Sequence, residues 1–232
     1  MKYFKATLCF CLWLPLAAGC GARASGHGPQ PATPAQAADI EACLGRLWTT
    51  QPLVYHVRQE VQIEFGGQKL TLDAFMQLDV GKRTARVVGM TTMGLKLFDI
   101  SVAATDSATD VATHAMAPNV RKPDELAAAV AAVVRRVFLE SAPRPTDAAR
   151  CTVEQIRLVH NAAGRSLEFS FNLSAKTLVK LACPAEGWYA SYREYDSADA
   201  ASGQVFAPRR IRYEDTRRGL HVQILIHKVT QR

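Results

Sequence analysis

The side chains that could do chemistry in this chain are few and lie far apart. Of the six histidines, His221 and His227 share one face of the last predicted strand. At about 3.3 Å per residue they are roughly 20 Å apart, so they cannot share a metal ion. The sequence contains no G-x-S-x-G, H-E-x-x-H, G-x-G-x-x-G or C-x-x-C motif and no P-loop. We therefore expect no enzyme activity, no cofactor and no metal site.

Cys20 is the one residue whose surroundings specify a reaction. Lys2 and Lys5 precede an apolar run from Leu8 to Ala18, which is shorter than the roughly 20 residues that span a bilayer. Such a run is typical of a secretory signal peptide. The sequence LAAGC at residues 16–20 resembles a bacterial lipobox, in which the cysteine thiol is acylated and the chain is cut before it. The alternative is an ordinary signal peptide with an incidental cysteine.

A lipid anchor and a flexible tether are the predicted start of the mature chain. We assign residues 1–19 to the signal peptide, 20–36 to the lipidated cysteine and tether, and 37–232 to one domain. The tether, Gly21 to Gln36, has three Pro and three Gly in 16 residues and should be disordered, with an end-to-end distance of roughly 20 Å. Acyl chains such as palmitate contribute roughly 0.8 kcal/mol per buried CH₂ and would hold the protein on a membrane. In bacterial lipoproteins, an aspartate directly after the lipidated cysteine commonly favours retention in the inner membrane. Gly21 occupies that position here, so we expect the protein to be exported to the periplasmic face of the outer membrane.

The charge of the chain is moderately basic. Lysine and arginine number 28 against 21 acidic residues, and removal of Lys2 and Lys5 leaves 26 against 21, or about +5. An exported lipoprotein has no nucleic-acid partner. The densest basic group consists of Arg209, Arg210, Arg212, Arg217 and Arg218. One interpretation of this group is a solvated strand edge. The other is a surface that binds anionic lipid head groups or an acidic partner.

Three cysteines remain in the predicted mature domain. Two of the six cysteines leave with the signal peptide and Cys20 is lipidated, so Cys43, Cys151 and Cys183 face an oxidising compartment. Three thiols allow one disulfide and one free cysteine in three possible ways. Their spacing fits no zinc-ligand pattern.

Alternating apolar and polar residues predict a mainly β, α+β domain. Strand patterns dominate after residue 50, and Gly66-Gly67 is a two-residue hairpin signal between two of them. Helical spacing follows Pro123 in the middle of the chain, and an earlier helix is expected over about residues 37–47. The predicted order is helix, about five strands, helix, about six strands. Such a single antiparallel sheet has too many strands to stay flat, and its helices should lie on one side.

Several stretches resemble the LolA/LolB-type lipoprotein carriers and receptors, especially LolB-like outer-membrane lipoproteins. They are the lipobox, "VQIEFGGQKLTLDAFMQLDVGKRTARVVGMTTMGLKLFDISV", the helix "LAAAVAAVVRRVFLESAP" and the closing "APRRIRYEDTRRGLHVQILIHK". The resemblance implies a strongly curved, incomplete β-barrel of about 11 strands, with helices covering its concave side and acyl chains in an apolar cavity. The region from Cys151 to Cys183 fits the family less well, and we prefer a Cys151–Cys183 disulfide within it.

The same resemblance implies a membrane-inserting loop. The receptor member carries an apolar residue at the tip of an N-P-L-G loop, and the matching residues here are Thr91 to Gly94, with neither Asn nor Pro present. We expect Met93, Gly94 and Leu95 to form the loop. The alternative for Met93 is a core methionine folded back under the sheet.

The candidate cavity residues are apolar positions of the strands and of the central helix. On the strand after the loop, Leu97 is expected to face the cavity while Phe98 faces the other way. The predicted lining is Val61, Ile63, Leu70, Leu72, Leu97, Val130, Val134, Phe169 and Phe171.

Two functions follow from these expectations. The first is an anchored lipoprotein that binds acyl chains of a lipid or lipoprotein in its cavity, receives them from a possible periplasmic carrier, and helps transfer or insert them into the outer membrane as a monomer. The second is a structural or assembly lipoprotein with a filled core, which binds another envelope protein through its sheet edge or basic group.

Overall fold

The computed structural model describes residues 34–105, 111–118, 120, 122–197 and 205–231. Residues 31–232 form one compact unit. The predicted signal peptide, Cys20 and most of the tether lie outside the described residues. Within the described ranges, no helix has the length and apolarity to cross a bilayer.

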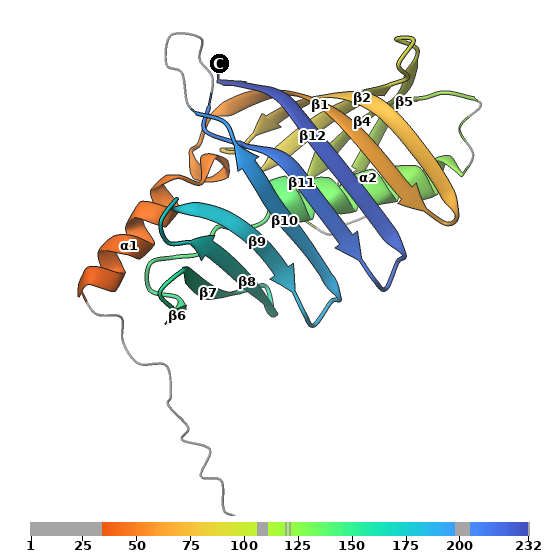
Figure 1. The fold of residues 1–232 in the computed structure, drawn as a ribbon. Helices are drawn as coiled ribbons and strands as arrows, with labels where there is room; N and C mark the ends of the chain where they lie inside the picture. The colour runs from red at the N-terminus through yellow and green to blue at the C-terminus, as the bar shows by residue number, and fades with distance from the viewer. Residues whose placement is uncertain (1–33, 106–110, 119, 121, 198–204, 232) are drawn as a thin grey trace, which may run out of the picture. The chain divides into compact units, whose positions relative to one another are not determined.

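One antiparallel sheet of twelve strands makes up most of this unit (Figure 1). The strands are β1 (Val54–Phe65), β2 (Gln68–Asp79), β3 (Thr84–Met90), β4 (Lys96–Ala103), β5 (Val111–Met116), β6 (Ala148–Cys151), β7 (Gln155–Ala162), β8 (Arg165–Asn172), β9 (Thr177–Cys183), β10 (Trp188–Tyr195), β11 (Pro208–Asp215) and β12 (Leu220–Gln231).

The sheet consists of two meanders joined by one long-range pair. Its order is β5-β4-β3-β2-β1-β12-β11-β10-β9-β8-β7-β6, so every neighbouring pair is consecutive in the chain except β1 and β12. The sheet is curved and not closed, and β5 and β6 are its two edges (Figure 1). It has twelve strands where about eleven were predicted. Seven strands, instead of six, follow the central helix, because the four-residue β6 also pairs with β7.

The central helix, α2 (Pro123–Phe138), begins as the sequence predicts. Pro123 occupies the first turn and Asp124 and Glu125 follow, where acidic groups favour the positive end of the helix dipole. Its apolar side chains pack with those of the buried face of the sheet, and Figure 1 shows α2 lying along that face.

The first helix, α1 (Pro34–Gly45), lies elsewhere than along that face. It is followed by a short 3₁₀ turn, η1 (Trp48–Thr50). Asp39 of α1 is 2.5 Å from the Lys176 Nζ, and Arg46, just after the helix, donates a hydrogen bond of 2.8 Å to the Ala175 carbonyl. These contacts hold α1 at the turn between β8 and β9, whereas helices in the plural were expected over the concave side.

The predicted facing of β4 is wrong in part. Phe98 was expected to face away from Leu97 and out of the core, yet both side chains are buried. A register shift between Gly89 and Met90 on β3 leaves Leu97 of β4 without a counterpart. Phe98 pairs with the inward-facing Gly89 and therefore points between the sheet and α2.

Candidate functional site

The apolar space between α2 and the first half of the sheet is the candidate site. It contains a cavity of about 30 Å³. Apolar side chains of α2 form one wall. Inward-facing residues of β1 to β4 and of β12 form the other, and they include the Phe98 ring of β4. The lining residues are Gln59, Val61, Ile63, Leu72, Ala74, Val87, Phe98, Val130, Val133, Val134, Phe138, Val222 and Ile224.

Gln59 is the single polar residue in that lining. Its side chain is buried, with 4% of the residue exposed, and its Oε1 has no hydrogen-bond partner among the described residues. An unsatisfied buried polar group costs about 1–3 kcal/mol. Its neighbours across the sheet are Ala74 on β2 and Ile226 on β12. Gln59 therefore lies in an apolar environment that leaves its Oε1 without a hydrogen bond.

Small residues next to Gln59 make room for the Phe98 ring. Ala74 pairs with Gly89 on β3, so Gln59, Ala74 and Gly89 form one row across the sheet. A Cβ on Gly89 would lie 2.4 Å from the Phe98 Cζ, so only glycine allows the ring to lie this close to the strand. The absence of large side chains in this row explains why the cavity is found here.

A second cavity of about 30 Å³ lies toward the other half of the sheet. Phe169, Tyr192 and Tyr195 line it together with the end of α2 and residues 46–49. The Tyr195 hydroxyl donates a 2.5 Å hydrogen bond to the Leu178 carbonyl. Burial raises the pKa of Tyr192 and of Tyr195. Both phenols are therefore neutral, and this cavity carries no charge from them.

The C-terminal half of α2 is fixed to the sheet by buried polar contacts. Arg136 Nη1 donates hydrogen bonds of 2.6 Å to the Tyr213 hydroxyl and 2.6 Å to Asp215 Oδ2. Its Nη2 contacts Glu186 at 3.1 Å, and its guanidinium lies 5.1 Å from the centroid of the Trp188 ring. These contacts tie the end of α2 to β10, β11 and the turn before β10.

The same end of α2 is also tied to the first meander. Arg135 Nε donates a 2.8 Å hydrogen bond to the Ala103 carbonyl, and Arg83 Nη2 donates a 2.9 Å bond to the Leu139 carbonyl. At the N-terminal end of α2, Lys122 Nζ donates a 3.0 Å hydrogen bond to Glu125, which is a local contact between side chains three residues apart. The polar anchors of α2 are thus concentrated at its C-terminal end.

The loop between β3 and β4 presents two apolar side chains to solvent. Met93 is 82% exposed and Leu95 is 64% exposed. The Thr91 N–H donates to the Leu95 carbonyl at 2.8 Å, and the Gly94 N–H donates to the Thr91 carbonyl at 2.9 Å. Gly94 has φ of +81°, which suits glycine. Met93 is therefore exposed, and the alternative of a core methionine is wrong.

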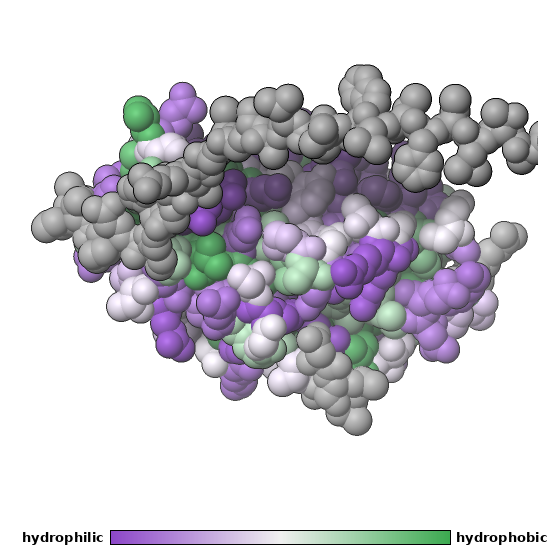
Figure 2. Space-filling model, turned by 90° about the horizontal axis from the view of Figure 1, so that it is seen from below, coloured by the Kyte–Doolittle hydropathy of each residue, from purple (hydrophilic) through white to green (hydrophobic). Residues whose placement is uncertain are grey.

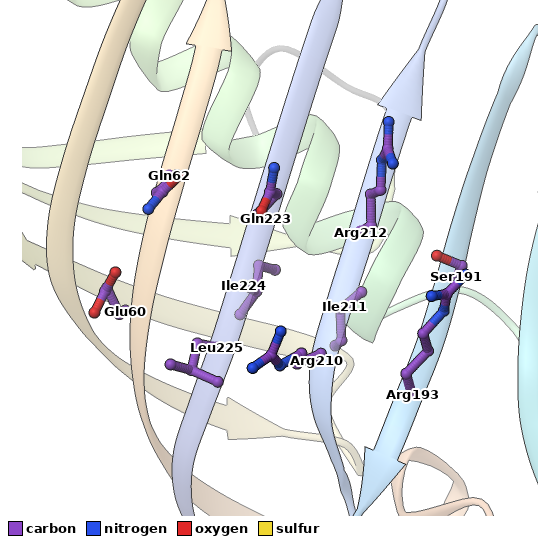
Figure 3. A pocket seen from close by; sticks show the side chains of 10 residues that line it. All are labelled: Glu60, Gln62, Ser191, Arg193, Arg210, Ile211, Arg212, Gln223, Ile224 and Leu225. Atoms are coloured by element: carbon purple, nitrogen blue, oxygen red, sulfur yellow. The ribbon is translucent and has the colours of Figure 1, made fainter.

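Two hollows of about 350 Å³ each lie on the outer face of the sheet. One of about 350 Å³ crosses β1, β12, β11 and β10, and α2 lies behind these strands in Figure 3. Arg210 Nε is 2.9 Å from Glu194 Oε2, and Arg212 Nη2 is 2.6 Å from Glu214 Oε1. The predicted basic group is also paired elsewhere: Arg209 with Asp196 at 3.7 Å and Arg218 with Asp215 at 3.7 Å. Acidic neighbours thus offset much of its charge.

Apolar surface outside the core is limited. The large exposed apolar residues of the described chain are Phe75, Met93, Leu95 and Val153. On the face shown in Figure 2, outside the grey atoms, hydrophobic residues lie in separate groups between hydrophilic ones. Among the described residues, most large apolar side chains are therefore in the core.

The three thiols of the domain are free. Cys43 and Cys183 are buried and Cys151 is partly buried, and burial raises the pKa of each thiol. Cys151 ends β6 and Cys183 ends β9, three strands further along the sheet. At about 4.8 Å between strands, their Cα atoms are too far apart for a disulfide. The preferred Cys151–Cys183 pair is therefore not formed. In the described ranges, no cluster of three His, Cys, Asp or Glu side chains could hold a metal ion.

The structure brings together five of the nine predicted cavity residues. Val61, Ile63, Leu72, Val130 and Val134 line the cavity under α2. The others lie apart from it, since Phe169 lines the second cavity, Leu97 and Phe171 are buried in the core, and Leu70 is only half-buried.

Gln59 is the important residue that the sequence reasoning missed. A signal for it was present, because Gln59 occupies an inward position in the alternation of Val57, Val61 and Ile63. A polar residue at an inward position of a strand is unusual enough to indicate a site.

Two solved structures align with most of this chain. A LolA superfamily protein from Nitrosomonas europaea aligns with a TM-score of 0.50 and 10% identity, over 84% of this chain and 92% of that chain. A putative outer membrane lipoprotein-sorting protein domain from Vibrio parahaemolyticus aligns with a TM-score of 0.47 and 7% identity over the same shares. At such identities the likeness concerns the fold alone.

Sequence comparison places the chain in a family. No curated protein matches it in sequence. The model of one family, described as "Protein of unknown function (DUF3261)", matches residues 56–196, from β1 to just beyond β10. That match covers more than half of the chain, which therefore belongs to the DUF3261 family.

Proposed function

We propose that this protein is a lipid-anchored envelope lipoprotein that binds acyl chains between α2 and the sheet. The observation that carries the proposal is the interior under α2, which is apolar on both walls apart from Gln59. Burial of an acyl chain there contributes roughly 0.8 kcal/mol per CH₂ and needs no directional chemistry. The LolA-superfamily fold of the solved neighbour supports this assignment.

An acyl chain enters this interior when α2 moves. The two cavities, of about 30 Å³ each, hold one or two water molecules and are too small for a lipid chain. The C-terminal end of α2 is anchored by Arg135 and Arg136, whereas its first half meets the sheet mainly through small apolar side chains. The first half of α2 therefore swings outward while the second half stays in place.

Transfer to the membrane is assigned to the loop between β3 and β4. In the LolB-like function that we propose, Met93 and Leu95 enter the acyl layer of the outer membrane while Gly94 shapes the loop. Their exposure and the hydrogen bonds within the loop support this role. The protein acts as a monomer on the periplasmic face, anchored through Cys20, and receives its cargo from a periplasmic carrier. We assign it no catalytic step.

Lipid uptake by residues 21–232, which include the whole compact unit, tests the proposal. We expect native mass spectrometry to show a co-purified or added acyl lipid bound to this fragment. Val134→Phe should reduce uptake because its ring fills the cavity under α2. Ala128→Phe is the matched control, since Ala128 is an exposed position of the same helix. Equal uptake by both variants would place the lipid elsewhere.

A structural or assembly role is the second candidate. The small size of both cavities favours it, because a core that α2 already fills needs no ligand. In that case the protein would bind another envelope protein through an edge strand or through the outer face. A wild-type fragment that carries no lipid and takes none up would favour this second function.

A further inference from the structure

The Gln59 amide gives the interior a chemical preference that apolar walls alone would not have. Its side chain is nearly fully buried, lines the cavity and has no hydrogen-bond partner for Oε1 in the part of the chain that the structure describes. Buried polar side chains in folded proteins are ordinarily hydrogen-bonded. The other twelve lining residues of this cavity are apolar, so their side chains offer Oε1 no hydrogen-bond donor.

The position of Gln59 in the sheet is specific. It lies mid-strand on β1, next to a register shift with β12 that leaves His227 without a counterpart. Such bulges commonly occur beside functional sites, where they redirect the strand. Across β1, the row of Gln59, Ala74 and Gly89 keeps large side chains away from the amide on that side.

From this geometry we infer that the interior recognises an acyl chain joined through a secondary amide. This inference rests on the proposed function. The glutamine side chain offers one carbonyl acceptor and an NH₂ donor. A secondary amide offers one N–H and one carbonyl, so it matches both. An ester of the same chain length supplies only acceptors and leaves Gln59 Oε1 unpaired, and a plain alkyl chain also leaves Oε1 unpaired.

The binding test uses two probes that differ in one group. N-methyldodecanamide and methyl dodecanoate have the same chain length, and the first has an N–H where the second has an oxygen. Isothermal titration calorimetry with residues 21–232 should give a dissociation constant about tenfold lower for the amide, the effect of one buried hydrogen bond. Gln59→Leu should bind both probes about equally. Gln62→Leu, on the same strand but lining the outer hollow, should keep the tenfold preference.

Thermal melting and a substitute variant guard against misfolding. Thermal melting of the ligand-free fragment should show Gln59→Leu at least as stable as wild type, because the unsatisfied amide is gone. If Gln59→Leu does not fold, Gln59→Met, which is unbranched, replaces it.

N-dodecanoylglycinamide then identifies the source of the amide. Binding as tight as that of the first probe assigns it to an acylated peptide, and weaker binding assigns it to an N-acyl lipid; both outcomes require Gln59.

The outcomes separate this inference from the proposed function. If wild type binds both probes equally, or if Gln59→Leu keeps the preference, acyl binding stands and the amide recognition is wrong. If wild type binds neither probe, the acyl-binding function fails and the inference fails with it. A tenfold preference that only the Gln59 variants lose supports the inference.

Discussion

Met93 is the residue whose side chain should separate lipid binding from lipid delivery. We expect Met93→Glu to retain lipid uptake and melting temperature, because an exposed side chain contributes little to stability. Transfer of a fluorescent lipid from the protein to vesicles should be lost, since a carboxylate costs about 2.5–3.5 kcal/mol in hydrocarbon. Met93→Leu should transfer normally. Transfer by Met93→Glu at the wild-type rate would remove the loop from the mechanism.

Asp99 should make the sheet sensitive to acid. Arg86 donates two hydrogen bonds of 2.8 Å to the Asp99 carboxylate. These hydrogen bonds are the main cause of the lowered pKa of Asp99. A lowered folded-state pKa contributes stability above the ordinary carboxyl pKa, and this stability is lost as pH falls through the folded value. Asp99→Asn should therefore lower the melting temperature at pH 7 and make little difference at pH 2. A pH-independent difference would exclude this ion pair as the cause.

At the same scale, the sequence predicted the apolar residues of the site better than the polar one. Val61, Ile63 and Leu72 follow a period of two that fixes which face they occupy. Gln59 follows the same period, which places it inward, but its polar side chain is typical of a solvent-facing residue, so the pattern and the residue type disagree. Its burial depends on α2, which lies more than sixty residues away in the chain. Tertiary packing of that kind is not encoded in a local pattern.

Among the elements, α2 depends on one buried arginine for its position. Arg136→Leu removes the partner of Asp215, whose side chain is only 2% exposed, and a broken buried ion pair typically costs about 3–5 kcal/mol. We expect the melting temperature to fall by about 10 °C in a domain of this size. Arg212→Leu is the control, because the Arg212 side chain is 65% exposed and its pair with Glu214 should contribute at most about 1 kcal/mol. Equal effects of the two variants would contradict a special role of Arg136.

The elements themselves were largely predictable, and the exceptions have local causes. The hairpin of β1 and β2 and the helix α2 carry strong periodic patterns with a clear turn or a proline at the start. The short β6, with sequence AARC, has no such alternation and forms because β7 provides a partner strand. The facing of Phe98 on β4 was missed because Leu97 and Phe98 are adjacent apolar residues, so alternation in the sequence does not decide which of them faces α2.

At the scale of the whole molecule, Cys20 should decide where the protein resides. Cys20→Ala should leave a precursor or a soluble form in place of the membrane-anchored one, because no thiol remains to be acylated. The measurement is incorporation of labelled palmitate together with fractionation of envelope membranes. Cys151→Ala, which removes a thiol from the folded domain, is the control. Equal palmitate incorporation by wild type and Cys20→Ala would rule out the anchor.

The volume of the interior is the whole-molecule property that the sequence could not predict. It depends on how strongly twelve strands curve and on how deeply α2 packs against them. Five of the twelve α2 residues from 127 to 138 are alanines, and these do not reveal that depth, because alanine suits both a buried and an exposed helix face. The apolar composition of α2 predicted its contact with the sheet, whereas the cavities of about 30 Å³ came from packing alone.

The pairing of β1 with β12 has a consequence for how the chain folds. All other strand pairs form within one meander or the other, from segments adjacent in the sequence. Joining β1 to β12 closes a loop of almost the entire domain, which costs the most chain entropy and is slow. The two meanders therefore form early and the central seam forms last. For a protein that crosses a membrane before folding, as we propose, the sheet stays in two halves until the final strand has emerged.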